Sequence, residues 1–200
     1  SALKELKTSR KAGTKKAVSD LLKELSKMPS PGLQVYCFGK FKLFRGAEEI
    51  TADQWSSEKA KMLFKYLVLA APKGYQHKDI LMELLWPDQD PSKTGNRLRV
   101  ALTALRKTLE PELERGSQSS YIFRKGDAYI LNFGDSGWSD IAELKKELQF
   151  ASEEKNQEIS LSHYVKAASL YQGDLFEEDP YSHWCIEARD ETKEKYLDAL

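Results

Sequence analysis

The sequence predicts an α+β domain followed by an all-α domain. Short β-rich runs lie between residues 33 and 50, helical patterns and then a hairpin pattern occupy residues 57–131, and helical patterns alone follow Trp138. The charge changes sign at the same place. Residues 1–139 carry 24 Lys and Arg against 16 Asp and Glu, a net charge of +8, whereas residues 140–200 carry 7 against 15, a net charge of −8. A basic first part is suited to a polyanionic partner.

Residues 1–32 predict a helical lead-in and a linker from a preceding domain. Apolar residues recur at helical spacing over residues 17–25. Pro29 and Pro31 then end the helix, because proline lacks an amide donor and disfavours helix in the residue before it. At the other end, residues 187–200 form a helical pattern that stops without a capping residue. We therefore expect this chain to be part of a longer protein, truncated at its C-terminus.

The next segment alternates between two periodicities. Its pattern predicts three strands and then three helices, at residues 33–38, 41–45 and around 50, and at residues 57–71, 78–86 and 92–109. Two β-rich arms over residues 121–131 flank Lys125-Gly126-Asp127, which is typical of a hairpin. An N-terminal antiparallel sheet, three helices and a C-terminal hairpin in this order predict a winged helix-turn-helix domain over residues 33–137, with the hairpin as its wing.

Residues 138–200 predict a helical domain. Amphipathic patterns cover residues 140–151, 161–171 and 181–200. Gly173 stands where the end of a helix favours a left-handed residue, and Pro180 is placed to begin the next helix. Paired helices of this length predict a tetratricopeptide-like arrangement.

The third predicted helix, residues 92–109, has an uneven charge pattern. It contains no acidic residue, although solvated helices commonly mix the two signs. A helical projection places Leu98, Leu102, Leu105 and Leu109 on one buried face. Small side chains occupy the centre of the opposite face and cations surround them. The predicted base-reading residues are Asn96, Val100, Thr103 and Ala104, and the predicted phosphate contacts are Lys93, Arg97, Arg99, Arg106 and Lys107.

Such a face fits the major groove of B-DNA. Asparagine can pair with adenine, while valine, threonine and alanine can touch thymine methyl groups, and the surrounding cations can bind phosphates. The hairpin adds two further predicted phosphate contacts, Arg124 and Lys125. A basic helix that only faces solvent is the alternative explanation, and the hairpin that follows argues against it.

Two sets of distinctive motifs occur in order along the chain. The first set is Phe38-Gly-Lys-Phe-Lys-Leu43, Trp55 with Ser57-Glu-Lys-Ala60, Leu84-Leu-Trp-Pro-Asp88 with Asp90-Pro91, and residues 96–107. The second is residues 171–184, Tyr-Gln-Gly-Asp-Leu-Phe-Glu-Glu-Asp-Pro-Tyr-Ser-His-Trp. The first set resembles the winged-helix half, and the second the helical half, of the bacterial transcriptional activator domain family, the architecture of the Streptomyces antibiotic regulatory proteins. Ala104 stands where many relatives carry arginine, and Asp127-Ala128 precede Tyr129 where relatives carry more glycine.

This resemblance implies an OmpR-type winged helix that binds double-stranded promoter DNA, joined to a helical activator domain. It also implies a bacterial, cytoplasmic regulator. The partners it implies are RNA polymerase or its sigma factor, and a second copy of the regulator on tandem sites.

Other kinds of chemistry lack their motifs. No glycine-rich phosphate loop, metalloprotease motif or hydrolase motif occurs, and His77, His163 and His183 share no metal-ligand spacing. His77 is placed to cap the second helix or to contact a phosphate. Cys37 and Cys185, 148 positions apart, exclude a disulfide scaffold and fit a reducing cytoplasm. The longest apolar run is far shorter than a membrane span. We expect no enzyme, no cofactor, no metal site and no membrane contact.

Two functions stay open. The first is sequence-specific DNA binding with transcriptional activation. The alternative is a protein-interaction module whose winged helix no longer binds DNA. The acid-free helix favours the first. We also expect Glu153, Glu154, Glu177 and Glu178 to form an exposed acidic face, and a chain ending near Asp140 to keep most of its DNA affinity.

Overall fold

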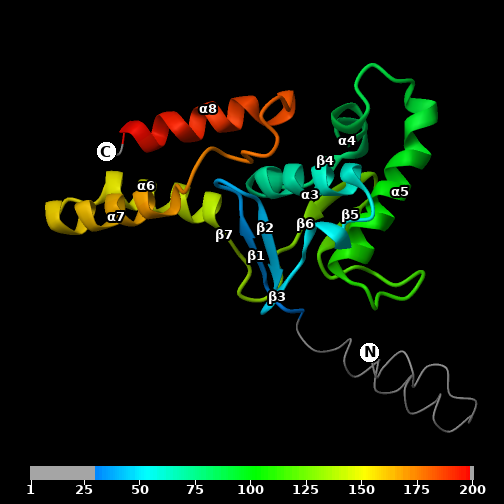
Figure 1. Ribbon diagram of the computed structural model, residues 1–200, viewed down its shortest axis with the longest axis horizontal. Coiled ribbons are helices and arrows are strands. Elements are labelled where there is room, and N and C mark those ends of the chain that lie inside the picture. The colour runs from blue at the N-terminus through cyan, green and yellow to red at the C-terminus, as the bar shows by residue number, and fades with distance from the viewer. Residues whose placement is uncertain (1–29, 199–200) are drawn as a thin grey trace, which may run out of the picture. The chain divides into compact units, whose positions relative to one another are not determined.

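The computed structural model describes residues 30–198 (Figure 1). The chain divides at Ser30 into two units, of which the second, from Pro31 on, is described here. The predicted helical lead-in falls almost wholly on residues 1–29, outside the described residues. The fold reported below is therefore that of the second unit.

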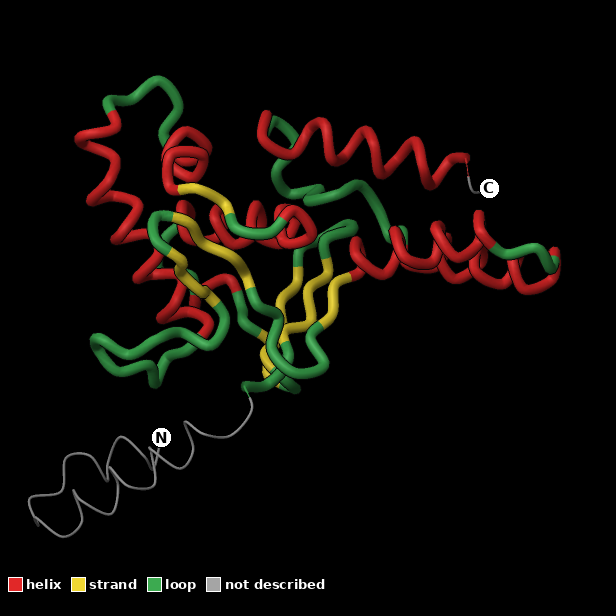
Figure 2. Tube along the Cα trace, turned by 180° about the vertical axis from the view of Figure 1, so that it is seen from behind, coloured by secondary structure: helices red, strands yellow, loops and turns green. Residues whose placement is uncertain are grey.

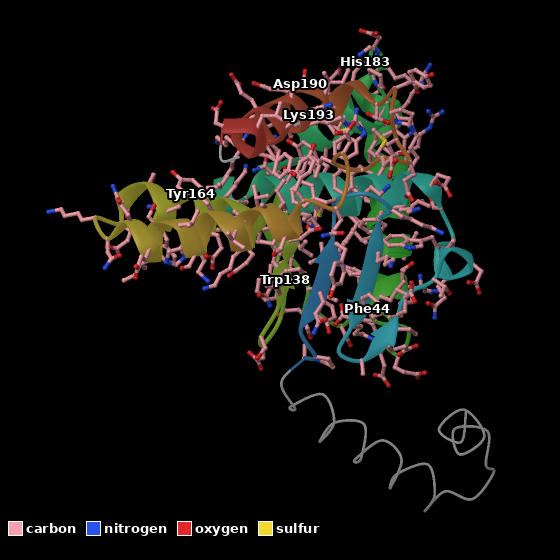
Figure 3. All side chains as sticks on the ribbon, turned by 60° about the vertical axis from the view of Figure 1, so that its left-hand side comes forward. Phe44, Trp138, Tyr164, His183, Asp190 and Lys193 are labelled. Carbon is pink, nitrogen blue, oxygen red and sulfur yellow. The ribbon has the colours of Figure 1, made fainter. Side chains whose placement is uncertain are left out.

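A four-stranded sheet with the order β3-β2-β1-β7 begins the second unit. Its strands are β1 (Leu33–Tyr36), β2 (Lys42–Arg45), β3 (Glu48–Glu49) and β7 (Trp138–Ser139). The first three pair antiparallel, as predicted, whereas β7 pairs parallel to β1 with Trp138 opposite Gln34. The inward side chains of Leu33, Val35 and Leu43 are fully buried. The outward face carries Tyr36, whose ring meets those of Phe44 and Trp138 edge-on. Phe44 and Trp138 are labelled in Figure 3.

Three helices follow close to their predicted positions: α3 (Glu58–Ala70), α4 (Lys78–Leu85) and α5 (Pro91–Leu109). Each begins at a side-chain cap that satisfies an otherwise unpaired amide. Ser57 accepts from the Ala60 amide, the His77 ring accepts from the Asp79 amide, and Asp90 accepts from the Ser92 amide. Capping was one of the two roles expected for His77. The leucines that face inward on these helices belong to one hydrophobic core together with the strands.

A second, three-stranded sheet has the order β4-β6-β5. It consists of β4 (Gln76–His77), β5 (Ile122–Lys125) and β6 (Ala128–Leu131). The predicted hairpin joins β5 to β6 with Lys125 opposite Ala128. Gly126, with φ of 59°, takes the first central position of the two-residue turn, which is the position that favours glycine in a type II′ turn. Both sheets are yellow in Figure 2.

The remainder of the chain is helical. Its helices are α6 (Asp140–Glu153), α7 (Gln157–Leu170) and α8 (His183–Asp198). A short turn joins α6 to α7, and these two helices pack along each other (Figure 1). Helix α7 begins four residues earlier than predicted, because Asn156 caps it by accepting from the Glu158 and Ile159 amides. Helix α8 begins at His183, three residues after Pro180.

The predicted boundary between residues 137 and 138 does not separate two cores. Strand β7 lies on this boundary and belongs to the first sheet. Asp140, the first residue of α6, is buried and accepts hydrogen bonds from the amides of Cys37 (2.7 Å) and Phe38 (3.0 Å). Burial raises the pKa of the Asp140 carboxyl, although the backbone hydrogen bonds oppose that rise. The helical part also adds residues to the core of the strands, namely Ile141, Leu144, Leu175, Phe176 and Cys185.

The segment between α7 and α8 is fastened to the end of β1. The amide of Gly39 donates to the Asp174 carbonyl (3.0 Å), and the amide of Phe176 donates to the Cys37 carbonyl (2.8 Å). Gly173 (φ of 149°) lies so close to Gly39 that a Cβ on Gly173 would be 3.0 Å from the Gly39 Cα. Two glycines therefore permit the two backbones to meet.

Lys65 of α3 reinforces this connection. Its side chain is 2% exposed, and its Nζ lies 2.6 Å from Glu178 Oε1 and 2.5 Å from Asp179 Oδ2. Lys61 also pairs with Glu178 at 2.6 Å. All four glutamates expected on an exposed acidic face, Glu153, Glu154, Glu177 and Glu178, are exposed. Glu178 is also paired with α3 through Lys61 and Lys65.

Candidate nucleic-acid interface

Helix α5 buries the face that the projection predicted. Leu98, Leu102, Leu105 and Leu109 are at most 3% exposed. The opposite face is open to solvent, and Val100 near its centre is 69% exposed. The residues predicted for DNA contact that the structure exposes on this helix are Lys93, Asn96, Arg97, Arg99, Val100, Thr103 and Lys107.

Two predicted site residues on α5 are half-buried. Ala104 packs against the hydrophobic core, so less of it faces outward than the projection indicated. Arg106 extends toward the hairpin, where its Nη2 donates to the Ile122 carbonyl at 3.3 Å. This hydrogen bond ties α5 to β5 and engages part of the guanidinium that was predicted to bind a phosphate.

The open face of α5 is organised by contacts with uncharged partners. Arg97 Nη1 donates to Gln89 Oε1 (2.6 Å), and Arg99 Nη1 donates to Asn96 Oδ1 (3.1 Å). The Thr103 hydroxyl donates to the Arg99 carbonyl (2.8 Å). Because the amide oxygens carry no net charge, the positive charge of both guanidinium groups is not neutralised by these contacts. The face is therefore well suited to an anionic surface.

The β5–β6 hairpin places Arg124 and Lys125 at its exposed tip, beside the N-terminus of α4. Arg124 Nε donates to the Gly126 carbonyl (2.6 Å), and its Nη2 lies 3.5 Å from Asp127 Oδ1. The other carboxylate oxygen of Asp127 pairs with Lys78 Nζ at 2.6 Å. The hydrogen bond from Lys78 lowers the pKa of Asp127, and the same bond raises the pKa of Lys78.

Sequence reasoning missed Lys78 and Asp127 as a pair. The two residues lie 49 positions apart and are brought together because β4 pairs with β6, with His77 opposite Ala128. Strand β4 is too short for a periodic pattern, and no turn signal links it to its partner β6, which lies far along the chain.

A pocket lies between α4, α5 and the hairpin, and we call it the hairpin pocket. Three cations, one acid and an apolar floor surround it. Its lining residues are Lys78, Met82, Gly95, Leu98, Arg99, Arg124, Asp127 and Tyr129.

Other chemically reactive side chains take structural positions. Cys37 and Cys185 are buried, and burial raises the pKa of both thiols. His163 on α7 pairs with Glu147 on α6. Within residues 30–198, no three His, Cys, Asp or Glu side chains are grouped as metal ligands would be. In the same part of the chain, no helix has the length and apolar character needed to cross a bilayer.

Comparison with known proteins gives a likeness of fold. No family model matches the chain, and no curated protein sequence matches it. Among solved structures, Mycobacterium tuberculosis EmbR, in complex with a low affinity phosphopeptide, matches with a TM-score of 0.64 at 16% sequence identity. The match covers 86% of this chain and 44% of EmbR, so the chain spans less than half of EmbR's length. The mixed α/β fold, with small sheets and several helices, thus resembles that of EmbR.

Proposed function

We propose that this chain is a DNA-binding transcriptional regulator. In this proposal α3, α4, α5 and the β5–β6 hairpin form a winged helix-turn-helix, with α5 in the major groove and the hairpin as the wing. The observation that carries the proposal is the acid-free outer face of α5, which places cations around small side chains directly opposite the buried leucines. The likeness of fold to EmbR and the sequence resemblance to the Streptomyces antibiotic regulatory proteins both support it.

The roles within the interface follow from exposure and chemistry. Asn96, Val100 and Thr103 are positioned to read base edges, with Ala104 at the border of the reading face. The exposed cations serve as phosphate contacts: Lys93, Arg97, Arg99, Lys107, Arg124 and Lys125. Arg106 has a second role as the link between α5 and β5.

Duplex binding with a defined salt dependence is the test of this proposal. If the exposed cations make about five or six phosphate contacts, log K should fall with log salt at a slope of roughly −4.5 to −5.4. Fluorescence anisotropy on promoter fragments at several salt concentrations measures this slope. The proposal fails if the chain does not bind duplex DNA, or if binding does not change between low and physiological salt.

The helical part is proposed to act on proteins rather than on DNA. Residues 140–200 carry a net charge of −8, which opposes contact with phosphates. His183, Asp190 and Lys193 of α8 are exposed along one side of the molecule (Figure 3). We propose that this part contacts RNA polymerase or its sigma factor, or a second copy of the chain on tandem sites. The whole chain is then a cytoplasmic binding protein without catalytic activity or cofactor.

The competing proposal is a protein-interaction module on the same scaffold. Two observations favour it: Arg106 is half-buried against the hairpin, which reduces its access to DNA, and Asp127 partly neutralises Lys78 and Arg124. An electrophoretic mobility assay against promoter fragments separates the two proposals, because a pure interaction module leaves the fragments unshifted.

A further inference from the structure

We propose that the hairpin pocket seats one phosphate group of the DNA backbone, and that Asp127 holds the place of this phosphate while the protein is free. This inference rests on the proposed function. It adds Lys78 and Asp127, neither of which the sequence indicated, to the interface. It also assigns Asp127 an unusual role for an acidic residue at a DNA surface, that of an intramolecular competitor.

The pocket has the construction of an anion site. Its floor is apolar, since Met82, Leu98 and Tyr129 are at most 7% exposed. Arg99 comes from α5, Arg124 from β5 and Lys78 from the first residue of α4, so three separate elements each contribute one cation. Guanidinium and ammonium groups bind carboxylate and phosphate oxygens by the same charge-assisted hydrogen bonds.

Asp127 already satisfies two of these cations. Its carboxylate lies 2.6 Å from Lys78 Nζ and 3.5 Å from Arg124 Nη2. Its main chain is fixed as well, because the Lys78 amide donates to the Asp127 carbonyl at 2.8 Å. Asp127 is charged at neutral pH, and the hydrogen bond from Lys78 lowers its pKa further below the ordinary value of 3.8. The third cation, Arg99, meets the neutral amide oxygen of Asn96 instead of a carboxylate.

The position of the pocket points to the DNA backbone as the source of the phosphate. Helix α5 and the hairpin each line part of the pocket. When α5 occupies the major groove and the hairpin reaches the neighbouring stretch of backbone, the strand between them passes over this pocket. A phosphate seated in the pocket contacts Lys78, Arg99 and Arg124, whereas a phosphate that lies beside the pocket is repelled by Asp127. Asp127 also lowers the affinity for a phosphate in the pocket, because its ion pairs with Lys78 and Arg124 must be broken before the phosphate can bind.

Substitution of Asp127 tests the competitor role. Asp127→Asn in the full chain keeps a residue that turns accept and removes the charge, so thermal unfolding should stay cooperative. We expect it to tighten binding to duplex DNA by about two- to fivefold, because the ion pairs of two exposed cations no longer have to be broken. In a Lys78→Met, Arg124→Met background this gain should be largely lost. Lys155→Met, which removes an exposed charge in the turn between α6 and α7, is the matched control and should leave the gain intact.

Neutral backbone linkages test the phosphate seat. Methylphosphonate is placed at one position at a time along a bound duplex. At one position it should weaken binding of the natural chain but not of the Lys78→Met, Arg124→Met variant. The inference is overturned if no position shows this coupling, or if Asp127→Asn leaves affinity unchanged or lowers it while the natural chain still binds duplex DNA. A natural chain that binds no duplex at all would instead overturn the proposed function.

Inorganic phosphate provides the second arm. We expect millimolar phosphate to leave the thermal stability of the chain unchanged, because a single free phosphate lacks the neighbouring contacts of a DNA strand. Stabilisation by phosphate that requires Lys78 and Arg124 would assign the pocket to a free phosphate ligand and overturn its assignment to DNA.

Discussion

At the scale of single residues, α5 separates anchoring from sequence reading. Arg97→Ala should weaken binding to all duplexes alike and flatten the salt slope by about one, because this cation contacts a phosphate in the proposed complex. Asn96→Ala should instead change the preference among operator variants, by about 1–3 kcal/mol for a well-made base contact. Anisotropy titrations over a set of operator variants measure both effects. If Arg97→Ala changes the preference while Asn96→Ala changes the overall affinity alone, α5 presents a different side to DNA.

Lys65 shows what a periodic pattern cannot reveal. The apolar positions of α3 predict its buried stripe, but they give no reason to place a lysine beside that stripe in the core. Its partners, Glu178 and Asp179, lie more than 110 positions away. Its Nζ also lies 4.7 Å from the centre of the Phe41 ring and 5.2 Å from that of Phe176. Two carboxylates and two rings together compensate the burial of one charge.

The two sides of this ion pair should differ in their effect on stability. Glu178→Ala with Asp179→Ala leaves the Lys65 ammonium buried without a carboxylate and should lower the free energy of unfolding by about 3–5 kcal/mol. Lys65→Met should cost less than about 2 kcal/mol, because the two carboxylates are about one-third exposed and can turn to water. Urea denaturation followed by tryptophan fluorescence compares the variants. Equal losses for the two would mean that the ammonium group reaches solvent or another acceptor.

At the scale of elements, the α6–α7 hairpin carries a pH-sensitive contact. His163 Nδ1 lies 2.5 Å from Glu147 Oε2, and the hydrogen bond from His163 lowers the pKa of Glu147 below its ordinary value of 4.5. Because the folded pKa is depressed, this contact stabilises the fold above the unfolded pKa and is lost as pH falls through the folded pKa.

Glu147→Gln should therefore flatten the pH dependence of stability in the acid range below about 4.5, where the natural chain loses this contact. At neutral pH the same variant should be less stable than the natural chain. Thermal melts at a series of acid pH values, recorded for both proteins, measure the difference. Parallel pH profiles for the two proteins would show that the contact does not couple proton binding to folding.

The elements also show where sequence patterns stop being informative. All six described α-helices and the β5–β6 hairpin were predicted, since each is long enough for periodicity or carries a turn signal such as Lys125-Gly126-Asp127. Strands β4 and β7 have two residues each, and their pairing depends on partners far along the chain. Pairing of β4 with β6 brings Lys78 to Asp127 at the hairpin pocket. Pairing of β7 with β1 brings Asp140 to the amides of Cys37 and Phe38. The missed elements are therefore the ones that complete the candidate site and the core.

At the scale of the whole molecule, the change in charge near residue 140 does not mark a structural boundary. The basic and acidic parts differ in the partners they suit, and this difference is visible in composition. The core does not follow this charge difference. Phe176 of the acidic part packs its ring against that of Phe41 in the basic part and against that of Trp184. The charge pattern therefore indicates two parts with different partners, while the fold packs both parts into one core.

The last prediction concerns a chain that ends at Asp140. The sequence predicts that this chain keeps most of its DNA affinity, whereas the shared core predicts that it does not. Such a chain loses Ile141, Leu144, Leu175, Phe176 and Cys185 from the core. Each large apolar side chain contributes about 1.5–3 kcal/mol on burial, against a total stability of about 5–15 kcal/mol for a typical domain. The shortened chain also leaves Lys65 without its carboxylates.

We therefore expect the shortened chain to lack a cooperative thermal transition and to lose its DNA affinity, even though every proposed DNA contact is retained. Circular dichroism melts and anisotropy titrations of the two chains measure this. The control is the full chain with Glu187→Gln and Asp190→Asn, which changes exposed charges on α8 without touching the core and should keep both the melt and the affinity. A shortened chain that unfolds cooperatively and binds duplex DNA as tightly as the full chain would show that residues 33–137 fold independently. If folding instead requires the helical part, then any signal that loosens its contact with α3 also reaches the buried face of α5, because α3 packs against both.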